Sequence, residues 1–378
     1  MPNELSSNAL SSCGAQAREL LANEPLVSEV HLYLLPLAAI NSSQRALLLK
    51  CLSDDEQAKV GRYQPKSRNN ALIVRAGLRH VLSLHRQSLH GTLSHETCLP
   101  EQWQFDYGKQ GKPELTAAQY AQTGINFNLS HSGEWLLIGV LQAPTHGKRY
   151  ALGVDIERRR DSTNIHTILK RYFAEAEISD LLALDASKQR DRFFDLWALK
   201  ESYIKACGKG LAMVLASFSF DINAARHLQN SDSTDSTDST SSTSSTSSIN
   251  SSSNNSSQGP KIHSLSLDGL FGFNSAESGV VSVNSPEPVT PEPVSADIDY
   301  SPAQQAVMTR INRAESLNWL SVPLQLGLNA GSGLELELKQ ELEQAGCSEK
   351  ADTAADNSWH SYLAQLDEQY RIGVSVGL

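Results

Sequence analysis

Apolar residues along the first 226 positions fall into runs that predict both strands and helices. Val30–Leu37, Trp135–Leu141 and Tyr150–Ile156 are short and nearly continuous apolar runs, which is typical of buried strands. Asn69–His85 instead spaces its apolar residues three and four apart, so we expect an amphipathic helix there. The pattern therefore indicates a mixed fold of helices and strands.

Further periodic segments follow toward the C-terminus. Ile165–Tyr172 and Glu175–Leu184 predict two helices, and Gln189–Cys207 predicts a longer one. Gly208 should end this last helix, because glycine readily adopts the left-handed conformation found after helix C-termini. Trp359–Val376 alternates apolar and polar residues around a turn, which indicates a hairpin or a pair of strands.

The segment between these regions has a different composition. Residues 229–259 consist mostly of Ser, Thr, Asn and Asp, and residues 285–294 read SPEPVTPEPV. Such sequences bury too little apolar surface to offset the entropy lost on ordering. Short apolar patches, such as 317–328, are compatible with either a strand or a helix. We expect residues 227–357 to form a long, mostly disordered insertion in a domain that closes with the last strands.

Charge is distributed unevenly along the 378 residues, a length sufficient for about two domains. The net charge is -10, although residues 1–226 carry slightly more Lys and Arg than Asp and Glu. The acidity therefore belongs to residues 227–378, and the charge of the whole chain says little about the ligands of the first part.

The five cysteines are scattered and include no CxxC pair, so we expect reduced thiols rather than disulfides or a zinc site. No apolar run is long enough to span a bilayer, and acidic residues interrupt the N-terminal stretch where a secretory signal would be basic and then apolar. The sequence therefore predicts a cytoplasmic protein.

The first candidate for chemistry is a pair of acidic residues in the segment ALGVDIERRR. Asp155 and Glu157 are two residues apart, so in a strand they project from the same face. Two carboxylates on one face offer the oxygen ligands that Mg²⁺ prefers. An isolated acidic pair near a strand end is more often simply solvated, so this motif needs support from others.

The second candidate is LWALKESYIKACGKGL, residues 196–211. Glu201 and Lys205 are four apart and share one face of the expected helix. Aromatic and aliphatic residues surround most of that helix, which favours its burial with these two residues facing a polar cleft. The alternative is an ordinary surface ion pair.

Two further segments offer groups that bind phosphate. INFNLSHSGEW, residues 125–135, brings together Ser130, His131 and Ser132, whose hydroxyl, imidazole and backbone donors suit a phosphate. A lone loop histidine is more often structural. A basic run without acidic residues lies between Gln57 and His95 and suits a polyanionic small molecule or an acidic protein, although it is also compatible with a solvated helix face. Few aromatic residues interleave it, so nucleic acid is a less expected ligand.

Together these segments resemble the Sfp-type 4'-phosphopantetheinyl transferases. The family's GxD motif corresponds to Gly153–Asp155, and its WxxKESxxK motif corresponds to Trp197–Lys205. The FNLSHSG segment at Phe127–Gly133 and the GKP segment at Gly111–Pro113 also match, in the family's order. The similarity runs from about residue 54 to residue 222 and resumes at the C-terminal strands, with the low-complexity segment outside it.

The resemblance implies an α+β fold, in which a pseudo-twofold axis relates two similar α+β subdomains and coenzyme A lies in the cleft between them. Residues 1–147 would form the N-terminal transferase half. Residues 148–226 together with 358–378 would form the C-terminal half. Residues 227–357 would be the mostly disordered insertion.

The resemblance also implies roles for individual residues. Asp155, Glu157 and Glu201 would bind Mg²⁺ together with the pyrophosphate of coenzyme A. Lys205 would contact that pyrophosphate and stabilise its charge during the reaction. Glu201, or a water molecule that it polarises, would accept the proton of the attacking hydroxyl.

The nucleotide would be bound by a second group of residues. Ser130 and His131 would hold the 3'-phosphate side, with Lys112 and Arg68 nearby. Lys59 is an alternative to Arg68, because the similarity around residues 56–70 is loose.

The implied reaction moves phosphopantetheine from coenzyme A to a serine of an apo acyl or peptidyl carrier protein and releases adenosine 3',5'-bisphosphate. Coenzyme A is then a substrate, Mg²⁺ a cofactor, and the chain a monomer that needs neither nucleic acid nor a membrane. The alternatives are a non-catalytic module that binds coenzyme A or another nucleotide, and a metal-dependent nucleotide phosphohydrolase. The carrier's pathway stays open among fatty-acid, polyketide, siderophore and nonribosomal peptide biosynthesis.

Overall fold

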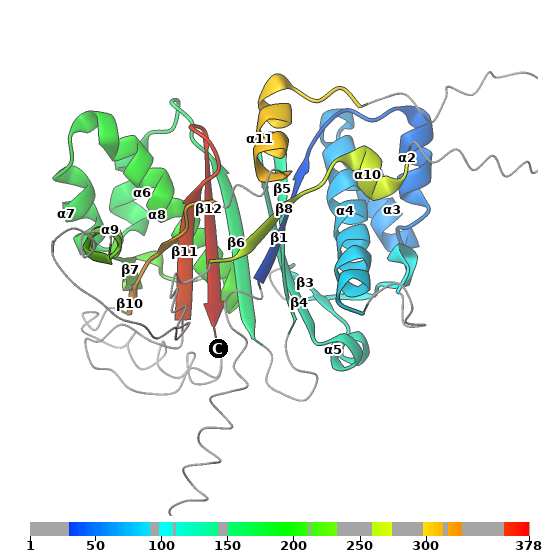
Figure 1. Ribbon diagram of the computed structural model, residues 1–378, viewed down its shortest axis with the longest axis horizontal. Helices are drawn as coiled ribbons and strands as arrows, with labels where there is room; N and C mark the ends of the chain where they lie inside the picture. Colours follow the sequence, from blue (N-terminus) through cyan, green and yellow to red (C-terminus); the bar gives the residue numbers. More distant parts are fainter. Residues whose placement is uncertain are drawn as a thin grey trace, which may run out of the picture.

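The computed structural model describes nine ranges of the chain. They are residues 30–90, 98–108, 111–142, 150–210, 213–232, 259–273, 298–312, 317–326 and 359–377. The expected mixture of helices and strands is confirmed. Two four-stranded sheets lie side by side in the middle of the molecule, and the long helices α4 and α8 lie on opposite outer sides of them (Figure 1).

The first sheet has the strand order β4-β5-β1-β8. Its strands are β4 (Ile125–Ser132), β5 (Trp135–Gln142), β1 (Val30–Pro36) and β8 (Lys261–Ser264). β5 is antiparallel to both of its neighbours, whereas β8 pairs in parallel with β1. Parallel strands need a long connection, and here the chain between β1 and β8 includes every element from α2 to α9.

Helices cover the outer face of this sheet, and an apolar core lies between them and the strands. They are α2 (Ser42–Leu49), α3 (Asp54–Gly61) and α4 (Pro65–His90), and the short β2 (Phe105–Tyr107), β3 (Pro113–Leu115) and α5 (Ala117–Thr123) follow. α4 contributes Leu72, Ile73 and Val81 to a core that also contains Leu35 and Ile138. α4 is longer than the predicted 69–85 and begins at a proline, which lacks the N–H that a first helical turn leaves unpaired.

The second sheet has the strand order β6-β12-β11-β9. Its strands are β6 (Ala151–Arg158), β12 (Tyr370–Gly377), β11 (Trp359–Gln365) and β9 (Leu320–Ser321). β11 and β12 form the antiparallel hairpin that the alternating pattern at the end of the chain predicts. The two sheets meet where β4 runs beside β6, and an apolar core shared by both sheets fills the junction.

α8 (Ala186–Cys207) lies against the second sheet so closely that backbone touches backbone. A Cβ atom at Gly153 on β6 would lie 1.9 Å from the carbonyl oxygen of Ser202. A Cβ atom at Gly373 on β12 would lie 2.3 Å from the carbonyl oxygen of Ala198. Only glycine permits this approach, and the helix ends as predicted at Gly208, with φ 70°.

The remaining elements surround α8. They are α6 (Ile165–Tyr172), α7 (Glu175–Leu182), β7 (Phe218–Phe220), α9 (Ile222–Asp232) and β10 (Leu324–Leu326), which pairs with β7. α6 and α7 confirm the two predicted helices, although α7 ends at Leu182 rather than Leu184. Within the described ranges, no helix combines the length and the apolarity that crossing a bilayer requires.

Several described elements lie inside residues 227–357, which the sequence predicts to be mostly disordered. These are the end of α9, β8, α10 (Leu267–Phe271), α11 (Pro302–Asn312), β9 and β10. They join both sheets and the core, so these parts are structural. β9 and β10 lie in the apolar patch 317–328, which is compatible with either a strand or a helix, whereas the four residues of β8 give no periodic signal. The low-complexity stretch 233–258 and residues 274–297 lie outside the described residues, so the inner boundaries of the insertion stay a prediction.

Candidate active site

Three predicted residues meet at the junction of the two sheets. The Nζ atom of Lys205 on α8 lies 2.7 Å from Oδ1 of Asp155 on β6. The hydroxyl of Ser130 on β4 donates to the same oxygen at 2.8 Å and accepts from Lys205 at 2.8 Å. Asp155 is buried, so this closed triangle of charge-assisted hydrogen bonds is shielded on the carboxylate side.

Alternation along β4 explains how Ser130 reaches this position. Asn128, Ser130 and Ser132 are two apart and therefore project to one face, toward β6. The side-chain oxygen of Asn128 accepts from the Val154 amide at 2.9 Å, and Ser132 Oγ accepts from the Arg158 amide at 3.1 Å. Three polar side chains of one sheet thus connect it to the first strand of the other. The sequence analysis did not assign Asn128 this role, although the two-residue spacing of polar positions was visible.

Glu157 and Glu201 complete a cluster of acidic residues around the triangle. Burial, followed by the charge of Asp155, raises the pKa of Glu157 to about 7, while Arg160 and Lys205 oppose the shift and Glu201 adds to it. Burial, again followed by Asp155, also raises the pKa of Glu201. Carboxylates that raise one another's pKa are close enough to interact, and they favour a bound proton or cation.

The donor chemistry of these residues fits a divalent cation. The second carboxylate oxygen of Asp155, Oδ2, is buried and has no hydrogen-bond partner among the described residues. All three acidic side chains offer the oxygen ligands that suit Mg²⁺. In the described part of the chain, however, no three His, Cys, Asp or Glu side chains are already gathered in metal-binding geometry. In this structure the cation that contacts Asp155 is the ammonium group of Lys205.

Lys112 lies close to this cluster, as the GKP motif implies. Its ammonium group donates to the carbonyl oxygen of Lys205 at 2.7 Å and so attaches the loop before β3 to the end of α8. Burial lowers the pKa of Lys112. It also lines a pocket of about 190 Å³ together with Asn126, Tyr150 and Ala206, between the first sheet and α8.

The remaining predicted nucleotide ligands lie in different places. His131 is exposed next to Ser130, and desolvation together with the charge of Lys205 lowers its pKa. Arg68 lies in the first turns of α4 and donates to the carbonyl oxygens of Gly61 and Tyr63 at the end of α3. His131 projects from the face of β4 opposite to Ser130 and is linked to the site through the charge of Lys205, whereas the contacts of Arg68 are with α3.

The lysine that precedes Glu201 in the same motif has a different environment. Lys200 is completely buried and lies 2.8 Å from Glu177 on α7. It also donates to the carbonyl oxygens of Leu215 and Phe218, on either side of a short 3₁₀ helix. Lys200 thus belongs to the core, whereas its neighbour Glu201 belongs to the acidic cluster. The two residues differ in role because they project from different faces of α8.

Comparisons with known proteins agree with this geometry. The model of the 4'-phosphopantetheinyl transferase superfamily matches residues 151–256, which include β6 and α8. The chain is 35% identical over 188 residues to the 4'-phosphopantetheinyl transferase HetI of Nostoc sp., a match that covers 50% of this chain and 72% of HetI. It is 36% identical over 149 residues to the 4'-phosphopantetheinyl transferase Sfp of Bacillus subtilis, covering 36% of this chain and 59% of Sfp.

These similarities define the class of this protein, which is a transferase of the phosphopantetheinyl type. The chain belongs to the 4'-phosphopantetheinyl transferase superfamily and, within it, to the Sfp-type family.

Proposed function

We propose that this protein transfers 4'-phosphopantetheine from coenzyme A to a serine of an apo acyl or peptidyl carrier protein, as the names of its relatives indicate. The observation that carries the proposal is the triangle of Lys205, Asp155 and Ser130, with Glu157 and Glu201 beside it. A cation and several carboxylates at the junction of two sheets suit a diphosphate that is bound together with a metal ion.

We infer that Asp155, Glu157 and Glu201 would hold Mg²⁺, and the unpartnered Oδ2 of Asp155 supports this assignment. When bound, the ion would neutralise negative charge on the pyrophosphate. Lys205, which now pairs with Asp155, would turn its ammonium group toward the same phosphates. The raised pKa values of both glutamates support the assignment as well, because a bound cation relieves the repulsion among the carboxylates.

The transfer step follows from these positions. The carrier's serine oxygen attacks the β-phosphorus, an O–P bond forms, and the bond from that phosphorus to the bridging oxygen breaks. Adenosine 3',5'-bisphosphate leaves with the bonding electrons, and Lys205 stabilises the charge that develops there. Glu201, or a water molecule that it polarises, accepts the serine proton. No covalent intermediate with the enzyme is needed.

The predicted nucleotide ligands differ in how well their positions support them. Lys112 contacts Lys205, and the charge of Lys205 acts on His131, which supports their assignment to the phosphate and 3'-phosphate side of coenzyme A. Ser130 faces Asp155 and Lys205, which favours a role at the pyrophosphate. Arg68 is bonded to the end of α3 and is the least supported of the four.

A repeated frame supports the proposal that the fold contains two related subdomains. Glu56 on α3 pairs with Arg79 on α4, and Glu177 on α7 pairs with Lys200 on α8. In each case the glutamate caps the start of its own short helix, because its side chain accepts from a backbone amide three residues earlier. In each case the cation also binds two carbonyl groups that flank a 3₁₀ helix.

Mass spectrometry of an apo-carrier incubated with the purified protein, coenzyme A and Mg²⁺ tests the proposed function. A gain of the phosphopantetheine mass on the carrier is expected. Binding of coenzyme A without that gain would favour the binding module, and release of nucleotide without modification of the carrier would favour the phosphohydrolase.

Asp155→Asn sharpens this test because it removes the charge but keeps the shape of the side chain. Carrier modification should fall by a factor of about a hundred to a thousand, with little change in the folded structure. Asp161→Asn is the matched control, since the Asp161 side chain is 84% exposed, and it should retain full activity. Normal turnover by Asp155→Asn would refute the assignment of the site.

A further inference from the structure

One part of the chain connects the outer edges of the two sheets. We define the strap as the described residues 259–273, 298–312 and 317–326, which contain β8, α10, α11, β9 and β10. β8 is the edge strand of the first sheet, and β9 is the edge strand of the second sheet. In Figure 1 the strap runs from β8 beside β1, through α10 and α11, to the strands beside β11. It is therefore attached to both sheets.

Between these two attachments, α11 lies across the junction of the sheets. Gln304 donates to the carbonyl oxygen of Glu134, in the turn between β4 and β5, at 3.2 Å. Arg310 donates to the carbonyl oxygen of Leu366, in the turn between β11 and β12. Val307 and Ile311 are buried in the core that both sheets share. α11 thus holds one turn of each sheet.

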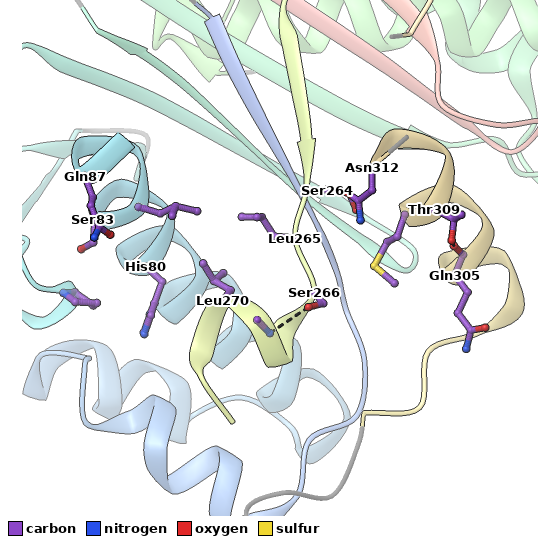
Figure 2. A pocket seen from close by; sticks show the side chains of 14 residues that line it. His80, Ser83, Gln87, Ser264, Leu265, Ser266, Leu270, Gln305, Thr309 and Asn312 are labelled. Atoms are coloured by element: carbon purple, nitrogen blue, oxygen red, sulfur yellow. Dashed lines mark hydrogen bonds between the residues drawn. The ribbon is translucent and has the colours of Figure 1, made fainter. Parts of the chain in front are cut away.

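The packing beside β8 is incomplete on one side. Figure 2 shows a pocket lined by residues of α4, of the β8–α10 segment and of α11, together with Pro100. Its volume is about 800 Å³. Its polar lining residues are uncharged or carry an imidazole, and they include Ser83, Gln87, Gln305, Thr309 and Asn312. On the side of the pocket, β8 therefore buries little apolar surface. Its attachment to the first sheet depends strongly on the pairing with β1 and on the side chains of the paired residues.

A group of three histidines and one tyrosine lies at this pairing. We define the clasp as His31 and Tyr33 on β1, His85 on α4 and His263 on β8. His31 Nδ1 lies 3.0 Å from His263 Nε2, and the two rings stack with centroids 5.2 Å apart. The Tyr33 hydroxyl lies 2.8 Å from His85 Nδ1, and the rings of His31 and His85 are 5.0 Å apart. The clasp thus joins one residue of the strap to two elements of the first sheet's layer.

The charges around the clasp disfavour its protonation. Besides the clasp itself, the titratable or charged side chains that the structure describes on the elements packed here are Arg68, Arg75, Arg79, His80 and Arg86 on α4, Lys261 on β8, Asp268 on α10 and Arg310 on α11. Asp268 accepts from the Tyr300 hydroxyl at 3.0 Å, and Arg310 bonds to Leu366. Burial, then His31 and His263, lowers the pKa of His85 to about 3. Burial, then Lys261, lowers that of His263.

We propose that the clasp fastens the strap to the first sheet while its imidazoles are neutral, and that uptake of protons by the clasp releases β8. A hydrogen bond between two imidazoles needs one nitrogen that accepts, and protonation of both rings removes it. It also places like charges about 5 Å apart at a partly buried site. The strap is then a pH-sensitive brace of the junction at which Lys205 meets Asp155.

The sign follows from the lowered pKa values. Docked His85 and His263 bind protons less readily than free histidines, whose pKa is about 6.5, so the released state binds more protons below that pH. Docking of β8 should therefore be fully present above pH 6.5 and weaken as the pH falls. Each proton taken up on release shifts the equilibrium by up to about tenfold per pH unit.

Hydrogen exchange of the β8 amides in the full-length protein, without substrate, tests the clasp. After correction for the intrinsic effect of pH on exchange, the protection of Ile262–Ser264 should fall by about tenfold or more between pH 7.5 and pH 5.5. β12, which lies far from the clasp in the second sheet, should keep its protection. Equal protection of β8 at both pH values would overturn the proposal.

Two variants isolate the histidine. His263→Gln keeps a donor and an acceptor but cannot take up a proton, so β8 should stay protected at pH 5.5. His166→Gln on α6, where the histidine is exposed, is the control and should respond to pH like the wild type. Release of β8 in His263→Gln with the wild-type pH profile would overturn the proposal. If β8 of His263→Gln is already unprotected at pH 7.5, NMR titration of His85 in the wild type replaces this variant as the test. Titration of His85 near pH 6.5 while β8 stays protected would then overturn the clasp proposal.

The effect on the junction rests on the proposed function and is read separately. At pH 5.5 coenzyme A should bind several-fold more weakly to the wild type than to His263→Gln, with equal affinities at pH 7.5. Equal affinities of the two proteins at pH 5.5, with β8 released only in the wild type, would show that the strap does not act on the site. Failure of both proteins to bind coenzyme A at pH 7.5 would count against the proposed function, while the exchange result would still decide the clasp.

Discussion

The α4 side and the α8 side of the molecule share a frame but differ in chemistry. On each long helix, a buried cation pairs with a glutamate of the preceding short helix: Arg79 with Glu56, and Lys200 with Glu177. On the α8 side, Glu201 follows the cation directly and contributes to the acidic cluster. On the α4 side, His80 occupies that position and lines the pocket of Figure 2, whose lining contains no acidic residue.

This difference shows that the buried ion pairs maintain the frame, whereas the residues that follow the two cations determine what each side can do. A scaffold and its site are separable even within one helical turn. The following changes test the separation, from the largest expected effect to the smallest.

Removing the buried cation should destabilise either side strongly. Lys200→Ala leaves the Glu177 carboxylate buried without its partner 2.8 Å away, and the free energy of unfolding should fall by about 3–5 kcal/mol. Arg79→Ala should have a similar effect through Glu56. Chemical denaturation measures both, with Lys188→Ala, whose side chain is 70% exposed, as a control expected to change little. A loss below about 1 kcal/mol for Lys200→Ala would contradict the structural role.

Adding a methyl group should distinguish how the two helices contact their sheets. In Gly153→Ala the new Cβ would lie 1.9 Å from a backbone oxygen of α8, so unfolding free energy should fall by about 3 kcal/mol. In Gly77→Ala on α4 the nearest atoms are the ends of two leucine side chains at 3.3 Å, which can move. That variant should stay within about 1 kcal/mol of the wild type. Similar losses in both would show that the α4 contact is just as rigid.

The acidic cluster should give the α8 side its own pH dependence in the absence of divalent cations. The pKa of Glu157 in the folded protein is raised to about 7, so its contribution to stability is fully present below about pH 4.5 and is lost as the pH rises through 7. Glu157→Gln should therefore stabilise the protein at pH 8 by about 1 kcal/mol and have no such effect at pH 4. Thermal unfolding in a chelating buffer measures this, and an equal effect at both pH values would argue against the cluster.

Much of this frame could be predicted from the sequence, because long amphipathic helices and continuous apolar strands carry a strong local signal. α8, with its end at Gly208, and the final hairpin are examples. β8 and β9 could not be predicted, since a strand of two to four residues at a sheet edge is defined by its partner rather than by its own pattern. Within 227–357 this reason applies to the short strands, whereas the helix α11 was missed because the composition of the surrounding chain favoured disorder.

The candidate site likewise has features that could be predicted from the sequence and features that could not. The spacing of Asp155 and Glu157 and that of Glu201 and Lys205 correctly placed each pair on one element, and motif order indicated that the elements belong together. The contact of Ser130 with both Asp155 and Lys205 depends on how β4 lies beside β6, which no local pattern specifies. The attachment of Arg68 to α3 likewise became visible only in three dimensions.

The two glycines beneath α8 have a consequence for protein engineering. The backbone of α8 packs directly on Gly153 and Gly373, so the helix can neither slide nor rotate to make room for larger side chains in the sheet beneath it. Libraries that seek new carrier or donor preferences should therefore leave the contact between this helix and its sheet untouched and diversify the exposed loops. Randomising Gly153 or Gly373 would mainly yield misfolded clones, whatever chemistry was selected.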